Sequence, residues 1–128
     1  MIFNIVPNKS VGEIDFGMER VEIRGVLKGF REEFKKSALS KNTTDDFGYC
    51  HVFYDISNKC NAIEFFDDVK LIYDSKNIFE LTVNELKEIF PDMIEEYGSY
   101  ISKKYSIGIY VEENKIESVL IGCEGYYC

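Results

Sequence analysis

The sequence predicts an α+β domain, in which two similar units of strand, helix and hairpin form an antiparallel sheet with helices on one face. The main observation is an internal similarity. Residues 49–65 (YCHVFYDISNKCNAIEF) and residues 105–121 (YSIGIYVEENKIESVLI) share an apolar pattern when they are offset by fifty-six positions. Both segments carry an Asn-Lys turn, and a helical pattern precedes each of them. We therefore expect a single domain of two tandem repeats, at about residues 1–66 and 67–128.

The first unit begins with two short extended segments. Residues 2–6 are apolar and end at Pro7, which donates no ladder hydrogen bond, and residues 11–17 alternate in polarity. A helix follows Gly17 and ends near Lys28. Its inward stripe consists of Ile23, Val26, Leu27 and Phe30, at i, i+3, i+4 and i+7.

The second unit repeats this order. Residues 69–73 predict a strand and residues 74–77 a turn. Thr82 and Glu85 then predict a capping box, in which the side chain of each residue accepts a hydrogen bond from the backbone N–H of the other. The helix that they start is expected to end just before Pro91.

Three stretches are harder to assign. Residues 30–39 fit either a further helical segment or an extended one, and both alternatives stay open. Residues 40–46 predict a polar loop, because short polar side chains compete for backbone hydrogen bonds. Residues 93–97 are read as one more helical turn.

The repeat also predicts which face of the sheet is core. Fifty-six is even, so matching residues of the two hairpins are expected to share a face. The bulkier stripe is assigned to the core: Tyr49, His51 and Phe53, with Tyr105, Ile107 and Ile109. Tyr54 and Tyr110 are then expected on the open face, since one face of an antiparallel sheet can stay in contact with water.

Charge is distributed unevenly along the chain. The net charge is −8. Residues 1–66 carry nine Lys or Arg against ten Asp or Glu, whereas residues 67–128 carry six against thirteen. The excess disfavours nucleic acid, whose phosphates require a basic patch, and favours a basic partner that the field attracts. The alternative, that acidity only keeps the chain in solution, stays open.

The expected compartment is the cytoplasm. The first ten residues (MIFNIVPNKS) have neither a basic region nor a long apolar run, so no secretory signal is expected. No run of about 18 apolar residues predicts a membrane span. The four cysteines form no CxxC pair and are expected as reduced thiols.

Motifs for catalysis or cofactor binding are absent: there is no G-x-S-x-G, no GxGxxG and no Walker loop. We expect no cofactor and no metal site, because Cys50 and His51 are adjacent on a strand and point to opposite faces. His51, the only histidine, is expected to pack in the core, with a catalytic base as the alternative. The acid pairs 45–46 and 67–68 are expected to be solvated turn residues.

Tyrosine is unusually frequent, with nine residues and no tryptophan. Tyrosine is enriched at interface hot spots, because it combines a rigid apolar ring with a polar tip. The alternative is that these rings are only half-buried at sheet edges.

Several segments resemble known bacterial proteins. Residues 7–27 read P-x-x-x-V-G-x-I-x-F-G-M-x-x-x-x-I-R-x-x-L, followed by AIEFF at 62–66, FEL at 79–81 and ISKKYSIGIYVEENKIESVLI at 101–121. These motifs resemble small bacterial proteins that look like immunity partners of polymorphic or contact-dependent toxins. The Gly-Met start and short helix are also distantly similar to the repeat of the SmpA/OmlA lipoproteins and of the β-lactamase-inhibitor protein. The chain lacks a lipobox, and the resemblance transfers no catalytic residue.

Charge, tyrosine content and resemblance together predict a non-catalytic immunity protein that binds a basic toxin domain, for example a nuclease. The expected partner-binding residues are Tyr54, Asp55, Tyr110, Glu112, Glu113, Glu117 and Tyr126. The second hypothesis is a small-ligand-binding module with a pocket between helices and sheet. The third is a small hydrolase that uses the acids and His51. The sequence does not indicate the oligomeric state.

Overall fold

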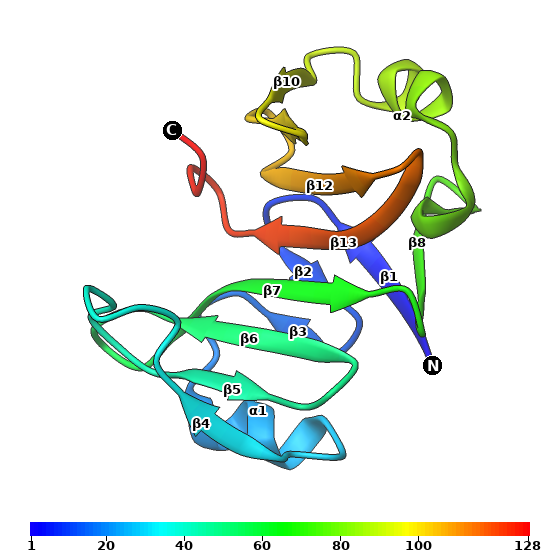
Figure 1. Cartoon of the computed structure of the whole chain (residues 1–128). Coiled ribbons are helices and arrows are strands. Elements are labelled where there is room, and N and C mark those ends of the chain that lie inside the picture. Colours follow the sequence, from blue (N-terminus) through cyan, green and yellow to red (C-terminus); the bar gives the residue numbers. More distant parts are fainter.

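The computed structural model describes all residues 1–128 and contains two sheets and two short α-helices (Figure 1). The large sheet is antiparallel throughout, with the strand order β10-β11-β12-β13-β7-β6-β5-β4. Its strands are β4 (Glu32–Phe34), β5 (Thr44–Asp46), β6 (Cys50–Tyr54), β7 (Cys60–Phe66), β10 (Ile94–Glu96), β11 (Ser99–Ser102), β12 (Ile107–Glu112) and β13 (Lys115–Gly122). The sheet therefore consists of two antiparallel meanders, joined where β7 pairs with β13. The α+β class predicted from the sequence is correct.

A second, smaller sheet has the order β3-β2-β1-β8-β9. Its strands are β1 (Ile2–Val6), β2 (Ser10–Val11), β3 (Ile14–Asp15), β8 (Lys70–Tyr73) and β9 (Lys76–Asn77). The strands β1 and β8 were both predicted, but they pair in parallel, with Phe3 opposite Leu71. The sequence did not indicate this pairing, because a parallel pair joins segments far apart in the chain and leaves no local turn signal.

Each meander is preceded by a short helix, α1 (Arg20–Val26) and α2 (Val83–Ile89); a 3₁₀ turn, η1 (Ile78–Glu80), precedes α2. The predicted capping box of α2 is present: Thr82 Oγ1 accepts from the Glu85 N–H at 3.2 Å, and Glu85 Oε1 accepts from the Thr82 N–H at 3.0 Å. The hydrogen bond from the Thr82 backbone lowers the pKa of Glu85. This helix ends at Phe90, next to Pro91, as its sequence predicted.

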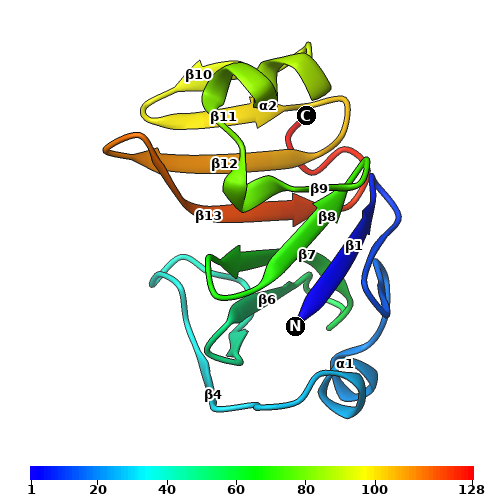
Figure 2. The ribbon, with the colours of Figure 1, turned by 90° about the vertical axis from the view of Figure 1, so that its right-hand side faces the viewer.

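The core lies between one face of the large sheet and a layer made by the small sheet and the helices. Figure 2 shows β1 and β8 crossing the large sheet, with α1 and α2 at its two ends. Apolar residues from all these elements form one buried cluster, including Phe3, Ile23, Val52, Phe65, Leu71, Leu86, Phe90, Ile109 and Val119. Burying each such side chain stabilises the fold by about 1.5–3 kcal/mol.

The predicted face assignment is right for the second hairpin and wrong for the first. Ile107 and Ile109 are buried in the core, as expected. In β6, however, Cys50, Val52 and Tyr54 face the core, so His51 and Phe53 do not belong to its inward stripe, while Tyr49, just before the strand, packs against the core.

The cause is one extra residue in the loop of the first hairpin. Between β12 and β13, Val111 pairs with Ile116 and four residues intervene. Between β6 and β7, the corresponding pair is Tyr54 with Cys60, and five residues intervene. Cys50 is opposite Phe65 in the first hairpin, and Ile107 is opposite Ile121 in the second. Residues of β7 therefore correspond to residues fifty-six positions later in β13, whereas residues of β6 correspond to residues fifty-seven positions later in β12. An odd offset reverses the faces of a strand.

Two further stretches differ from the sequence-based expectations, and in a third the structure decides between the alternatives that were left open. Residues 40–46 are not wholly a loop, since Thr44 and Asp45 are buried in β5. Residues 30–39, for which helix and extended backbone were both open, contain the short strand β4. Residues 93–97 form β10 instead of a helical turn. In each case strand pairing with a neighbour in the large sheet overrides a weak local signal.

Candidate functional site

The outer face of the large sheet is covered neither by the helices nor by the small sheet, and we call it the open face. Register places on it His51 and Phe53 from β6, Glu64 and Phe66 from β7, Gly108 and Tyr110 from β12, and Ser118 and Leu120 from β13. Phe53 is only 9% exposed, whereas Tyr110 is 42% exposed. Over the first meander this face has a hollow of about 370 Å³, whose lining includes Lys36, Phe53 and Tyr126. Its other accessible part lies over the second meander, at Tyr110.

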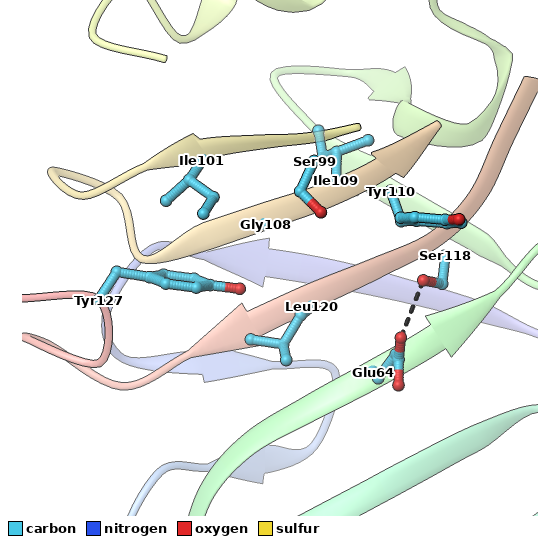
Figure 3. A pocket seen from close by; sticks show the side chains of 9 residues that line it. All are labelled: Glu64, Ser99, Ile101, Gly108, Ile109, Tyr110, Ser118, Leu120 and Tyr127. Atoms are coloured by element: carbon cyan, nitrogen blue, oxygen red, sulfur yellow. Dashed lines mark hydrogen bonds between the residues drawn. The ribbon is translucent and has the colours of Figure 1, made fainter. Parts of the chain in front are cut away.

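A groove of about 290 Å³ occupies this accessible part (Figure 3). Its lining comes from five segments: Glu64, Ser99, Ile101, Gly108, Ile109, Tyr110, Ser118, Leu120 and Tyr127. Apolar side chains and hydroxyl groups alternate along it, and no Lys or Arg lines it. An apolar groove with a few polar groups is the usual form of a binding site.

The C-terminal residues form one wall of the groove. The ring of Tyr127 lies against Gly108: a Cβ at Gly108 would stand 2.1 Å from the Tyr127 hydroxyl oxygen. A Cβ at Gly122 would likewise meet Tyr126 at 2.7 Å. Both positions therefore require glycine for the tail to pack as it does. Burial raises the pKa of both tyrosines, so their hydroxyls stay neutral near pH 7.

Glu64 supplies the only charged side chain in the groove. Its Oε2 accepts a hydrogen bond from Ser118 Oγ at 2.8 Å. The neighbouring His51 lies opposite Glu64 in the strand register, but its Nε2 is 3.4 Å from Asp46 Oδ1. Glu64 takes part in none of the ion pairs of the protein. A half-buried carboxylate without a cationic partner is thus available to a ligand.

Five of the predicted partner-binding residues lie at or near this groove or on the second hairpin. Tyr110 forms part of the groove, and Glu112, Glu113 and Glu117 are exposed around the hairpin turn. Tyr126 is half-buried against Gly122, beside the groove residue Tyr127. None of the three glutamates forms a side-chain ion pair.

The other two predicted residues, Tyr54 and Asp55, lie elsewhere. Tyr54 is 7% exposed and faces the core, so the prediction that it points to the open face is wrong. Asp55 is exposed, but its Oδ1 accepts hydrogen bonds from the backbone of Ser57 and Lys59 at 2.9 and 3.0 Å. It shapes the loop of the first hairpin.

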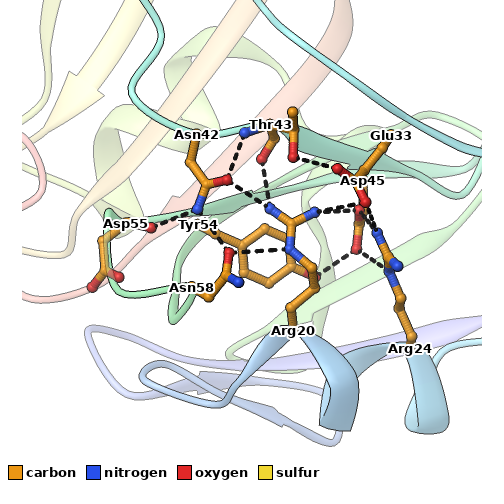
Figure 4. A network of polar contacts seen from close by, with 9 residues as sticks. All are labelled: Arg20, Arg24, Glu33, Asn42, Thr43, Asp45, Tyr54, Asp55 and Asn58. Atoms are coloured by element: carbon orange, nitrogen blue, oxygen red, sulfur yellow. Dashed lines mark hydrogen bonds and ion pairs between the residues drawn. The ribbon is translucent and has the colours of Figure 1, made fainter.

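Tyr54 belongs instead to a polar network around the buried Asp45 (Figure 4). Arg24 binds the Asp45 carboxylate with two atoms, Nε at 2.9 Å and Nη2 at 2.6 Å. Arg20 Nη1 donates to Oδ1 at 2.7 Å, and the Tyr54 hydroxyl donates to Oδ2 at 2.9 Å. The hydrogen bond to Asp45 raises the pKa of Arg24, and burial raises that of Tyr54.

This network links α1 to the first meander and leaves neither oxygen of the Asp45 carboxylate for a ligand. Asp45 is 0% exposed, and both of its oxygens already accept two hydrogen bonds. The expectation that Asp45 is a solvated turn residue is therefore wrong. The sequence signal was present, since Arg20 and Arg24 are four residues apart on one helix face and can converge on one acid.

His51 is also placed differently from its prediction. It lies on the open face and not in the core, because of the one-residue difference between the hairpin loops. Its ring makes edge contacts with Phe34 at 5.1 Å and Phe66 at 5.0 Å between ring centroids. The histidine thus packs in an aromatic row at the side of the groove away from Tyr110.

Three findings concern other kinds of site. No group of three or more His, Cys, Asp or Glu side chains is arranged to hold a metal ion. All four cysteines are free thiols, and burial raises the pKa of Cys60 to about 12. Neither helix has the length and apolar character that crossing a membrane requires.

Comparison with known proteins gives no match: no family model, no curated protein and no solved structure is significantly similar to the chain. The resemblance to immunity proteins therefore stays a prediction, and the open face is the feature from which we infer a function.

Proposed function

We propose that the protein is a cytoplasmic bacterial immunity protein, which binds a basic toxin domain and neutralises it without catalysis. The single observation that carries this proposal is the juxtaposition of an exposed apolar groove with unpaired acids. Tyr110 joins the groove to the hairpin turn that bears Glu112 and Glu113.

The two features contribute in different ways. Unpaired glutamates on the rim attract a basic partner and raise its association rate, which salt then weakens. An exposed tyrosine beside an apolar groove supplies the apolar area that a partner covers and desolvates at the centre of such a complex. The uneven charge of the chain acts in the same direction, because the excess acid belongs to residues 67–128, which form this surface. The same charge disfavours nucleic acid as the partner.

A second candidate function, a small-ligand-binding module, is favoured by the groove alone. Its volume of about 290 Å³ lies near the lower end of the range for small-molecule sites, about 300–1,000 Å³. The site differs from the predicted location, since the groove lies on the open face and not between the helices and the sheet.

Genome neighbourhood and co-expression test the main proposal. A neighbouring reading frame is expected to encode a basic, enzyme-like domain, and co-expression with the present chain should restore growth of cells that this domain kills. Tyr110→Ala should reduce protection. Leu39→Ala is the control and should not reduce it, because Leu39 is an exposed apolar residue between β4 and β5, at the other end of the large sheet. A gene that stands alone, far from any toxin or secretion locus, would contradict the proposal.

We also propose that the two halves arose by tandem duplication. The register between β7 and β13 supports this, because Ser118 pairs with Phe66 and Gly122 with Ala62. Ala62 and Ser118 are fifty-six residues apart, and so are Phe66 and Gly122, so the offset of the repeat exchanges these two pairs. Asn58 and Asn114, the matching turn residues, also share a left-handed backbone, with φ of 64° and 62°.

A further inference from the structure

The groove on the open face has the chemistry of a receptor for a cationic side chain. We infer that it binds one arginine side chain of the protein partner, with the guanidinium at Glu64 and the aliphatic stem along Leu120 and Ile101. The inference rests on the proposed function and deepens it, because it names the group of the partner that enters the groove.

Charge is the first argument. Glu64 Oε2 accepts from Ser118, while no protein donor reaches Oε1, and no Lys or Arg lies within ion-pair distance of either oxygen. Figure 3 shows this carboxylate at the side of the groove, with Leu120 and Ser118 next to it. A carboxylate in such surroundings gains most from a ligand that brings its own positive charge and donors.

The other polar groups of the groove also favour a ligand rich in donors. They are the hydroxyls of Ser99, Ser118, Tyr110 and Tyr127, each of which can accept a hydrogen bond. A guanidinium has five N–H donors and no acceptor, so it can use Glu64 and neighbouring hydroxyls together. A carboxylate or phosphate ligand would instead face Glu64 with like charge.

Shape distinguishes arginine from lysine. The Tyr127 ring lies across Gly108, and Tyr110 stands at the other end of the groove (Figure 3). Aromatic faces stack well on a planar guanidinium and less well on a compact, strongly hydrated ammonium group. The apolar part of the lining, with Ile101 and Leu120, suits the three methylene groups of the arginine stem.

The test is a titration of the isotopically labelled full chain by NMR, with Nα-acetyl-arginine methylamide as the probe. Amide signals of groove residues such as Gly108, Ser118 and Leu120 should shift together. The norleucine analogue, which has an apolar stem without charge, should cause small shifts, and the lysine analogue should bind more weakly than arginine.

A matched pair of variants makes the result decisive. Glu64→Gln keeps the shape and the acceptor for Ser118, and should weaken arginine binding by about tenfold, the loss expected for one charge-assisted pair. Glu32→Gln removes the same charge from an exposed position in β4 that does not line the groove, and should leave binding within about twofold. Equal weakening by both variants, or shifts scattered over the acidic surface, would overturn the inference.

Two further outcomes separate this inference from the proposed function. If n-butylguanidinium, which has the same single charge as the probe and no peptide groups, binds more tightly than the probe, the occupant is a small ligand and the inference of a protein side chain is overturned. If the toxin domain binds and Glu64→Gln has no effect on it, the inference fails while the proposed function stands. If the arginine probe binds Glu64 but no neighbouring basic domain binds the chain, the proposed function fails and the cationic groove remains.

Discussion

The two hairpins of the large sheet place matching residues in very different surroundings. Phe53 and Tyr110 each precede the bulge on the first strand of their hairpin, and both face outward. Phe53 is covered, with Lys36 Nζ 4.5 Å from the centre of its ring, whereas Tyr110 is exposed beside a groove. The comparison shows that Phe53 is covered by its own chain, whereas Tyr110 is available to a partner.

Acidic residues follow the same division. In the first half, Asp45 and Glu33 are bound by arginines, and Asp46 lies beside His51. In the second, Glu112, Glu113 and Glu117 are exposed and unpaired. The arginine-bound acids of the first half therefore contribute mainly to stability, and the exposed glutamates of the second hairpin contribute mainly to the external field.

The largest effect is expected from Asp45→Asn. The change leaves Arg20 and Arg24 with only the more exposed Glu33 as an anion, and it should lower the free energy of unfolding by about 3 kcal/mol. The matched change in the second half, Glu117→Gln, should alter it by less than about 0.5 kcal/mol. Urea unfolding measures both. A comparable loss in the two variants would show that the halves do not differ in this way.

A smaller effect on stability is expected when Tyr54 and Tyr110, which the sequence similarity aligns with each other, are each changed to phenylalanine. Tyr54→Phe removes a buried donor to Asp45 and should cost about 1–2 kcal/mol. Tyr110→Phe removes a hydroxyl that forms no hydrogen bond within the protein and should leave stability unchanged within about 0.5 kcal/mol. Thermal or urea unfolding distinguishes them, and a reversed order would mean that the face assignment of β6 is incorrect.

Local patterns with a strong physical signal were predictable from the sequence. The capping box of Thr82 and Glu85 fixed the start of α2, and the stripe of Ile23 and Leu27 identified α1 and its buried face. In both hairpins an Asn in the left-handed conformation marks the turn. Such signals depend on residues close in the chain, so no tertiary information is required.

The features that the sequence did not predict arise from one additional loop residue or from strand pairing. The additional residue in the loop between Tyr54 and Cys60 reversed β6, and a similarity that treated the two hairpins as equal in length could not show it. The parallel pair of β1 with β8 is formed by partners far apart in sequence, and the short strand β5 consists of polar residues whose local pattern predicts a loop. In the site, the exposed acids and Tyr110 were predictable from their residue types. Glu64 and Tyr127 were not, because the register of the sheet and the path of the C-terminal residues bring them to the same groove.

The central claim is that the second half of the open face recognises a basic partner and the first half does not. Association rates with the basic domain encoded beside the gene test it most directly, using two double variants of equal net charge. Glu112→Gln with Glu113→Gln should slow association about threefold to tenfold at low salt, and Glu13→Gln with Glu32→Gln should change it less than about twofold. Equal slowing by the two pairs, or slowing by the first-half pair alone, would contradict the claim.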